Sequence, residues 1–456
     1  MPSPDAVPIE PGVAPAPILV PPASASASAS ASASVASAAP VDDLAPVGSR
    51  YIWLMVLAQF GVWVAFITPL AISLAVRVGQ LAPGHEEYLG YITGAGALAV
   101  MLTSPLFGTL SDRTRTRLGR RRPWMIGGMI LGVISLVVMA LAPSVLWLGF
   151  GWILAQLGWG QTLSNLQTST ADRLPESQRG KVAGLIGFST QIAPVVGVII
   201  ASSFTGEHLQ LQLFLVPGAV GVILVTVFLF LIHEDDSRGL AFDAPLSFGG
   251  LFRKYVYSPS QFPDFSWNWL GRFLFYFGLT LNTTFTAFFF ASRLHVDIAD
   301  VGGIIAALAG AGVLATTAGA LGGGFLSDRF HRRRIFVLIG AILFGAGAVI
   351  MAFAPSLPII VVGSVLVSMG IGTFAAVDQA LLLDVLPEKQ TDAGRFMGIM
   401  AFAISMPQAF APFIAPLFLA VGVVAGGEKN YTLLYIVAAA CTLSGGFVVL
   451  KIRSVR

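Results

Sequence analysis

Two charged residues lie inside otherwise apolar stretches of the sequence. Arg272 stands in NWLGRFLFYFGL and Asp378 in FAAVDQALLL. An ion in such surroundings is costly and is usually kept for a task, such as proton transfer. We predict that Asp378 pairs with Arg272 and exchanges this partner for a proton during a working cycle. A purely structural ion pair is the alternative.

A second group of charges forms short motifs of aspartate and arginine. The segment GTLSDRTRTRLGRRRPW, residues 108–124, holds six arginines after Asp112. A related segment, GGFLSDRFHRRR, begins at residue 323 and places Asp328 before a second cluster of arginines. Carboxylates next to arginines form charge-assisted hydrogen bonds, so both motifs are candidate ionic contacts.

The composition of the chain indicates which elements must position these residues. Only 11% of the 456 residues are Asp, Glu, Lys or Arg, whereas 55% are hydrophobic. A soluble protein needs a more highly charged surface. Apolar runs of about 20 residues, long enough to cross a bilayer as a helix, recur after residue 50. We predict an all-α membrane protein with twelve transmembrane helices, at residues 51–78, 88–110, 124–142, 145–170, 182–204, 211–233, 266–292, 301–326, 335–354, 357–383, 396–422 and 431–451.

Basic residues are unevenly distributed between the two ends of these predicted helices. All but four of the 26 Lys and Arg residues fall in loops after even-numbered spans or in the tails. The exceptions are Arg77, Arg272, Arg293 and Lys429. Cytoplasmic loops retain Lys and Arg, so both termini are predicted to be cytoplasmic, and the protein is expected in the plasma membrane.

The sequence repeats itself once. The two arginine motifs align Asp112 with Asp328, and ADRLPESQRG at 171 matches LDVLPEKQTDAGR at 383, which aligns Asp172 with Asp384. TQIAP at 190 also has a counterpart in PQAFAP at 407. Matches in the same order predict two pseudo-symmetric six-helix halves. We place the halves at residues 50–233 and 265–456, a cytoplasmic central loop at 234–264, and a disordered low-complexity tail at 1–49.

These motifs resemble those of the major facilitator superfamily of transporters. The loop motif of that family is carried by Gly108, Asp112, Arg113, Gly119, Arg120 and Arg121. The inserted TRTRL between its two parts is similar to the glycoside-pentoside-hexuronide and sucrose symporters. The resemblance covers roughly residues 50 to 455 and implies two halves that rock around a site near the middle of the membrane.

The resemblance further implies that the charged motifs form a conformational latch at the cytoplasmic face. The carboxylates are expected to be held by arginines of the same loop and by helix N-termini of the opposite half. Solvated loop charges are the alternative. The expected latch residues are Gly108, Asp112, Arg113, Gly119, Arg120, Arg121, Asp172, Asp328, Arg329 and Asp384.

In this superfamily the first, fourth, seventh and tenth helices line the cavity, which directs attention to their polar residues. Amides, hydroxyls and indoles suit a neutral polyol, since they offer hydrogen bonds and an apolar face for a ring. Each could instead join neighbouring helices. The predicted substrate-binding residues are Gln59, Trp63, Gln156, Trp159, Gln161, Asn165, Asn282, Thr283, Asp378 and Gln379.

Together these features predict a monomeric secondary transporter that takes up a neutral sugar or glycoside with protons by alternating access. Sodium coupling is disfavoured, because the carboxylates of melibiose-type sodium sites are missing. A proton-antiport exporter of a drug or metabolite is the alternative, and a membrane sensor on a transporter scaffold is a third.

Other chemistry is not expected. The single cysteine, Cys441, and five scattered histidines offer neither a disulfide framework nor metal-ligand spacing. No nucleotide-binding P-loop motif occurs. The arginine run lies in a short loop without interleaved aromatic residues, which disfavours nucleic-acid binding. We therefore expect no enzymatic activity, cofactor, metal or nucleic-acid partner.

Overall fold

The computed structural model describes residues 46–206, 208–232, 236–239, 257–388, 393–423 and 429–455. Within these ranges all regular structure is helical. Most of the predicted tail (residues 1–45) and of the predicted central loop (240–256) lie outside the described residues. Many large apolar side chains point outward, among them Ile223, Leu314 and Phe325, as a lipid-facing surface requires.

The helices follow the predicted spans. The N-terminal half holds α1 (Ser49–Thr68), η2 (Pro69–Ser73), α2 (Leu74–Leu81), α3 (Glu87–Asp112), α4 (Arg122–Ala140), α5 (Val145–Arg173), α6 (Glu176–Ser202) and α7 (Gln210–Leu231). The C-terminal half holds α9 (Pro263–Thr284), α10 (Thr286–Leu294), α11 (Gly302–Phe330), α12 (Arg333–Ala352), α13 (Leu357–Val385), α14 (Ala393–Ala420) and α15 (Tyr431–Val449).

In the described part of the chain, ten helices are long and apolar enough to cross a membrane, or eleven if α9 and α10 form one bent span. The remaining predicted span is α5, which has 29 residues but carries polar side chains along its length. Its polarity suits a helix that faces other protein rather than lipid.

The first span of each half departs from a regular α-helix at the same place in the repeat. Pro69 starts the π-helical turn η2 between α1 and α2, and α9 meets α10 at Phe285 with a bend of 51°. Phe285 follows Pro69 by the same 216 residues that separate Asp328 from Asp112. Proline removes a backbone donor, and such local breaks are typical of functional positions.

Each half packs mainly on itself. In the N-terminal half α1 contacts α5, α6 and α7, and in the C-terminal half α12 contacts α13 and α15. The halves meet through two related helix pairs, α3 with α14 and α6 with α11. Each pair joins the second span of one half to the fifth span of the other, as two-fold pseudo-symmetry requires.

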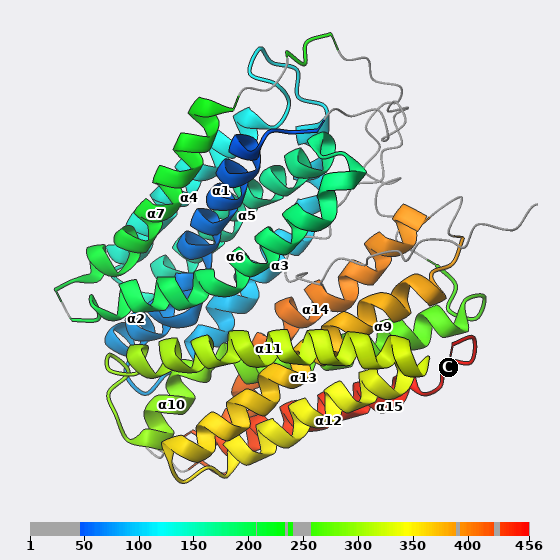
Figure 1. Ribbon diagram of the computed structural model, residues 1–456. Coiled ribbons are helices and arrows are strands. Elements are labelled where there is room, and N and C mark those ends of the chain that lie inside the picture. The colour runs from blue at the N-terminus through cyan, green and yellow to red at the C-terminus, as the bar shows by residue number, and fades with distance from the viewer. Residues whose placement is uncertain are drawn as a thin grey trace, which may run out of the picture.

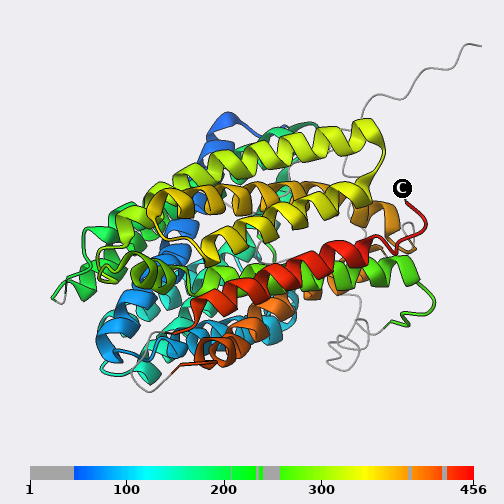
Figure 2. The same ribbon diagram turned by 90° about the horizontal axis from the view of Figure 1, so that it is seen from below.

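The two ends of the molecule differ. We call the end that carries loop 113–121 and the His331–Arg332 turn the arginine-rich end. The end that carries residues 82–86, 295–301, 421–423 and 429–430 is called the opposite end. Figure 1 shows the two bundles inclined to each other, with α2 and α10 close to the point where they meet. The C-terminal residues lie beside the turn between α11 and α12 (Figure 2), where Arg334 donates to Leu450 and Ile452.

Contacts between the halves gather at the opposite end. Lys429 binds Glu87 across the halves at 3.0 Å. A methyl group added at Gly90 would lie 2.4 Å from the carbonyl oxygen of Pro412, and one at Gly94 would lie 2.8 Å from the ring of Phe413. Only glycine permits so close an approach. The structure is therefore closed at the opposite end.

Candidate functional site

The two interior charges form a buried ion pair. Nε and Nη2 of Arg272 on α9 both lie 2.5 Å from Oδ2 of Asp378 on α13. The side chains are only 7% and 2% exposed. The second carboxylate oxygen, Oδ1, is buried without a hydrogen-bond partner among the described residues, and Nη2 also reaches Oε1 of Gln379 at 3.5 Å. The structure thus brings three predicted site residues together.

The repeat shows that the fold does not need charges at this crossing. Arg272 aligns with Val56 on α1, and Asp378 aligns with Leu166 on α5. Both counterparts are buried apolar residues. The N-terminal half therefore has apolar residues at both equivalent positions, in two separate apolar clusters, and needs no ions there.

Two predicted residues on α1 lie deep between helices. Gln59 is fully buried, and its amide nitrogen donates to Thr170 on α5 at 3.4 Å. Its Oε1 and the indole nitrogen of Trp63 have no hydrogen-bond partner among the described residues. Trp63 contacts Phe66, which stacks on Trp152 of α5 at 5.9 Å. Unsatisfied donors and acceptors beside aromatic faces can serve a solute that carries hydroxyl groups.

Two predicted substrate contacts need correction. Trp159 is fully buried and packs against Gly132 of α4 and Gly221 of α7, so it is part of the core of the N-terminal half. Asn165 accepts a hydrogen bond from Ser111 at 2.5 Å and belongs to the arginine-rich end. Both residues lie on α5 as predicted, but the rotation of the helix turns their side chains to neighbouring helices.

The other predicted contacts are spread along the helices. Gln156 lies against Gly96 of α3, and Gln161 is half-buried on the same helix as Asn165. Asn282 is buried, with Nδ2 unpartnered among the described residues. Thr283 is exposed and donates to the carbonyl of Leu279 within its own helix. The structure does not bring these residues into contact with the Arg272–Asp378 pair.

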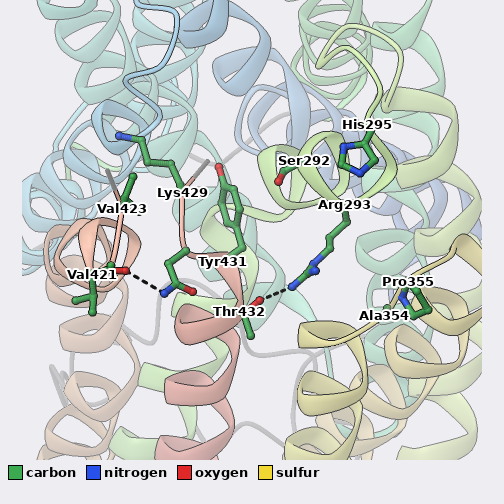
Figure 3. Close-up of a pocket in the computed structure, with 12 residues that line it drawn as sticks. Ser292, Arg293, His295, Ala354, Pro355, Val421, Val423, Lys429, Tyr431 and Thr432 are labelled. Carbon is green, nitrogen blue, oxygen red and sulfur yellow. Dashed lines mark hydrogen bonds between the residues drawn. The ribbon is translucent and has the colours of Figure 1, made fainter. Parts of the chain in front are cut away.

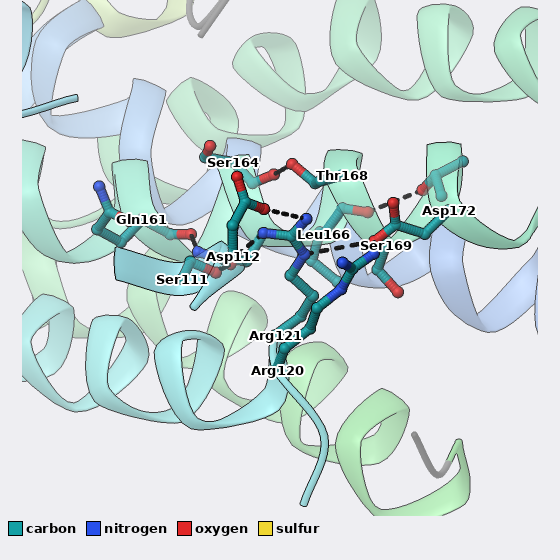
Figure 4. Close-up of polar contacts among 12 residues, drawn as sticks. Ser111, Asp112, Arg120, Arg121, Gln161, Ser164, Leu166, Thr168, Ser169 and Asp172 are labelled. Atoms are coloured by element: carbon teal, nitrogen blue, oxygen red, sulfur yellow. Dashed lines mark hydrogen bonds and ion pairs between the residues drawn. The ribbon is translucent and has the colours of Figure 1, made fainter. Parts of the chain in front are cut away.

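At the arginine-rich end, Arg121 connects two carboxylates of the N-terminal half (Figure 4). It binds Asp112 at the end of α3 at 2.6 Å and Asp172 near the end of α5 at 3.4 Å. Arg120 also binds Asp172, at 2.7 Å. The Arg121 side chain is only 7% exposed and donates to Ser111 as well. This single buried guanidinium therefore ties α3, α5 and the start of α4 together.

Glycines and a backbone cap shape the same loop. Gly119 has a φ of 87°, in the left-handed region that other residues rarely adopt. Arg113 is the C-cap of α3, and Gly108 lies one helical turn before Asp112. The motif residues thus set the path of the chain into the Arg121 contacts.

The C-terminal half repeats the arrangement around Arg333. Arg333 binds Asp384 at 2.5 Å and Asp328 at 3.4 Å. Arg333 follows Arg121 by 212 residues, as Asp384 follows Asp172. Arg329, which was predicted as a latch residue, is exposed at the end of α11, and Arg333 was not among the predicted latch residues. The alignment of Asp384 with Asp172 also places Arg333 opposite Arg121, so it could have identified Arg333. The alignment of Asp328 with Asp112 does not, because the loop that follows Asp112 is longer than the loop that follows Asp328.

None of the ion pairs described at the arginine-rich end crosses between the halves: Arg121 and Arg333 each hold carboxylates of their own half. The crossing ion pair, Glu87 with Lys429, lies at the opposite end. The expected contacts of the latch with helix N-termini of the other half are not among those described.

The sequence profile of the Major Facilitator Superfamily matches residues 51–320 and, in a second match, residues 269–456. The chain belongs to the Major Facilitator Superfamily. It is therefore a transporter and not an enzyme. Membership confirms the predicted fold of two six-helix halves.

Solved structures of this superfamily share the fold. The nucleoside transporter NupG superposes with a TM-score of 0.69 at 13% identity, covering 88% of this chain and 98% of that one. A bacterial homolog of the human lysosomal transporter Spinster, in an inward-facing and unoccupied conformation, gives 0.68 at 16% identity, with 89% and 99% covered.

Curated relatives match over shorter segments. A general alpha-glucoside permease of Schizosaccharomyces pombe is 37% identical over 92 residues, which is 20% of this chain and 15% of the relative. Inositol transporter 4 of Arabidopsis thaliana is 37% identical over 71 residues, 16% of this chain and 12% of the relative. The multi-drug resistance efflux pump PmrA of Streptococcus pneumoniae serotype 4 is 26% identical over 188 residues, 39% and 45%. The chain thus spans less than half the length of each of these relatives.

Proposed function

We propose that this superfamily member is a proton-coupled symporter that takes up a neutral sugar or glycoside by alternating access. The observation that carries the proposal is the buried pair of Arg272 and Asp378, with Oδ1 of Asp378 unpartnered among the described residues. The other polar groups in the interior helices, such as Gln59 and Trp63, are neutral. Ionic recognition of a substrate would need further interior charges.

The proposed coupling step uses both oxygens of Asp378. A proton that binds Oδ1 neutralises the carboxylate and weakens its attraction for Arg272. The guanidinium can then turn to Gln379, whose Oε1 lies 3.5 Å from Nη2. Both α9 and α13 belong to the C-terminal half, so this exchange changes how the helices of that half pack. The packing of the C-terminal half against the N-terminal half then changes as well, and the solute binds between the two halves.

The direction of the molecule in the membrane follows from its charge. We place the arginine-rich end in the cytoplasm, together with both termini, because cytoplasmic loops retain Lys and Arg. The described start of the chain lies at this end, where the Val47 amide donates to Gln178 near the start of α6. The structure, closed at the opposite end, would then be open towards the cytoplasm. We expect a monomer in the plasma membrane.

The charged clusters around Arg121 and Arg333 are proposed to act as the latch. In the present structure they hold each half together. When the arginine-rich ends approach each other, the same carboxylates could receive helix N-termini from the other half. The cycle would therefore exchange contacts at one end for contacts at the other.

Efflux is the second candidate, favoured by the similarity to PmrA. The name of that relative describes drug export, while two other relatives are named for alpha-glucosides and inositol. The interior argues for the neutral polyols, because the residues described there pair their one carboxylate, Asp378, with Arg272 and leave no free anion for a cationic drug.

Reconstituted vesicles provide the test. The pH outside vesicles that contain the protein is recorded while mono- and disaccharides are added one at a time, without an imposed gradient. Alkalinisation with one sugar identifies a proton symporter and its substrate. Silence with every sugar, together with acidification outside when a cationic dye is added there and exchanges for internal protons, would replace the proposal by proton-antiport export.

A further inference from the structure

Asn268 on α9 is a fully buried amide. It is 0% exposed, and neither its Nδ2 nor its Oδ1 has a hydrogen-bond partner in the part of the chain that the structure describes. Other polar side chains of the C-terminal half find partners. Arg293 donates to Thr432 (Figure 3), and the indole nitrogen of Trp269 donates to the carbonyl of Ile399 at 3.0 Å. Burying an amide without hydrogen bonds is costly, so Asn268 needs an explanation.

The neighbours of Asn268 along α9 show which way its side chain points. Arg272 and Phe275 follow it by four and seven residues, so the three side chains share one face of the helix. Arg272 binds Asp378 on α13, and the ring of Phe275 stacks on Phe374, also on α13, at 3.5 Å. Asn268 therefore faces α13 as well, one helical turn from Arg272 and nearer the start of α9.

The facing side of α13 brings one carboxylate close to this amide. Phe374 and Asp378 are followed on the same face by Leu381 and Val385, which are both buried. Of these four residues only Asp378 is polar, and its Oδ1 is buried without a partner among the residues described. An unsatisfied amide and an unsatisfied carboxylate oxygen thus lie within about one helical turn of each other, on two helices that face each other.

The repeat shows that packing does not require an amide at this position. Asn268 aligns with Ile52 on α1, as Arg272 aligns with Val56. Ile52 and Val56 belong to one apolar cluster of the N-terminal half. The C-terminal half therefore has two polar residues, one helical turn apart, where the other half has two apolar ones. The hydrogen bond of Asn268 is to be sought in another state of the ion pair.

We infer that Asn268 is the hydrogen-bond partner of protonated Asp378, an inference that rests on the proposed proton-coupled function. A proton that binds Oδ1 of Asp378 forms an O–H bond there, removes the charge of the carboxylate and releases Arg272. The new O–H group donates to Oδ1 of Asn268, while Nδ2 donates back to the carboxyl group, so both atoms of the amide are satisfied. When the proton leaves, the electron pair stays on Oδ1, and the carboxylate binds Arg272 again.

Other titratable groups near this contact must be considered, because they also affect protonation. Tyr276, one turn beyond Arg272 on α9, interacts electrostatically with both Arg272 and Asp378. Tyr435 of α15 stacks on Phe289, towards the opposite end. The helices packed against α9 and α13 carry charged residues at or just beyond their arginine-rich ends, namely Asp328 and Arg329 (α11), Arg333 and Arg334 (α12), Arg395 (α14) and Lys451 (α15). Tyr276 is therefore the competing candidate for the partner of protonated Asp378.

Infrared difference spectroscopy of the purified full chain in phosphatidylcholine vesicles tests the contact, with the proton itself as the probe. The band of a protonated carboxyl group that is lost in Asp378→Asn belongs to Asp378, and its growth from alkaline to acid pH gives the midpoint of protonation. Asn268→Ile introduces the residue of the other half. It should lower this midpoint by about 0.5–1 pH unit, because a hydrogen bond made only in the protonated state is lost. An amide band of Asn268 should change together with the carboxyl band in the wild type.

Three further variants keep the test decisive. Thr442→Val is the matched control, since Thr442 is buried in the same half but donates to Ala439 of its own helix, and its midpoint should equal that of the wild type. Tyr276→Phe should shift the midpoint less than Asn268→Ile does. Asn268→Ala replaces Asn268→Ile if that variant does not fold. A wild-type midpoint in the Asn268 variants, an equal shift in Thr442→Val or a larger shift in Tyr276→Phe would overturn the inference.

The outcome also distinguishes this inference from the proposed function. If Asp378 takes up a proton with the same midpoint in the wild type and in Asn268→Ile, the role of Asn268 is wrong and proton coupling through Asp378 stands. If no carboxyl band depends on Asp378 at any pH at which the protein stays folded, Asp378 is not the proton carrier, and the role of Asn268 is contradicted with it.

Discussion

The guanidinium of Arg272 lies 2.5 Å from the carboxylate of Asp378, at a helix crossing where the other half of the molecule places Val56 and Leu166. The same scaffold thus occurs twice in one chain, once with an ion pair and once without. Comparing the two halves therefore distinguishes what the fold requires from what the ion pair adds. Valine and leucine are the replacements that the comparison suggests for Arg272 and Asp378.

The double variant Arg272→Val with Asp378→Leu should fold. It introduces the apolar residues that the N-terminal half has at the two equivalent positions, and replacing a buried ion pair by apolar residues is often neutral. The single change Asp378→Leu leaves a buried arginine without its partner and should cost about 3–5 kcal/mol. Unfolding in mixed detergent micelles, followed by tryptophan fluorescence, compares the two. A double variant as unstable as the single one would show that the pair is needed for folding.

The arginine clusters of the two halves should differ in their contribution to stability. Arg121 is 7% exposed, whereas Arg333 is 27% exposed and its partner Asp328 is 65% exposed. Arg121→Gln should therefore cost about 2 kcal/mol or more, and Arg333→Gln less than about 1 kcal/mol, because exposed pairs contribute little. The same micelle unfolding measures both. Equal losses would mean that burial does not set the strength of these contacts.

A larger residue at the contact between the halves should open the opposite end. Gly94→Val places side-chain atoms against Phe413 and the carbonyl of Ala409, so the closed state becomes strained. Cysteine introduced by Ala409→Cys, in a Cys441→Ser background, should then react faster with an impermeant maleimide. Gly127→Val is the control, because a methyl group there meets nothing within 4 Å. Unchanged labelling in Gly94→Val would argue against closure at this contact.

The loop before α3 should make stability depend on pH. Burial raises the pKa of Glu86, although Lys429 and His85 nearby lower it, while Glu87 raises it further. The folded state therefore holds the proton more tightly than the unfolded chain. The free energy of unfolding therefore falls as the pH rises from the ordinary pKa of a glutamate to the raised pKa of Glu86. Above both pKa values the loss is complete.

Glu86→Gln should thus raise the unfolding temperature at neutral pH and have no effect in acid, below both pKa values. Thermal unfolding measured across a pH series checks this. Asp300→Asn, at an exposed carboxylate, is the control and should change little at any pH. A gain for Glu86→Gln that persists in acid would show that charge is not its cause.

Much of this architecture could be predicted from the sequence, since it depends on patterns along the chain. Apolar runs located the spans, and the repeated aspartates marked equivalent ends of helices. The pairing of Arg272 with Asp378 was predicted from their similar depths in two apolar spans. These features depend on length and hydropathy, which a bilayer makes strict.

The rest depends on how the helices turn and pack. Trp159 and Asn165 were assigned to the cavity from their helix alone, yet helix rotation decides which neighbour a side chain meets. Arg333 was missed because loops of unequal length hide equivalent residues. Arg77 and Arg293, at equivalent positions of the repeat, donate to the carbonyl groups of Ala142 and Ala352 near the ends of other helices. No pattern along the chain reveals these contacts.

The measurement that tests proton coupling most directly compares two transport modes of Asp378→Asn in vesicles, with the sugar identified by alkalinisation. Exchange of labelled for unlabelled sugar needs no proton movement, whereas accumulation driven by a pH gradient does. If Asp378 carries the proton, Asp378→Asn keeps exchange, which also shows that the variant is folded, and loses accumulation. Accumulation equal to that of the wild type would contradict it.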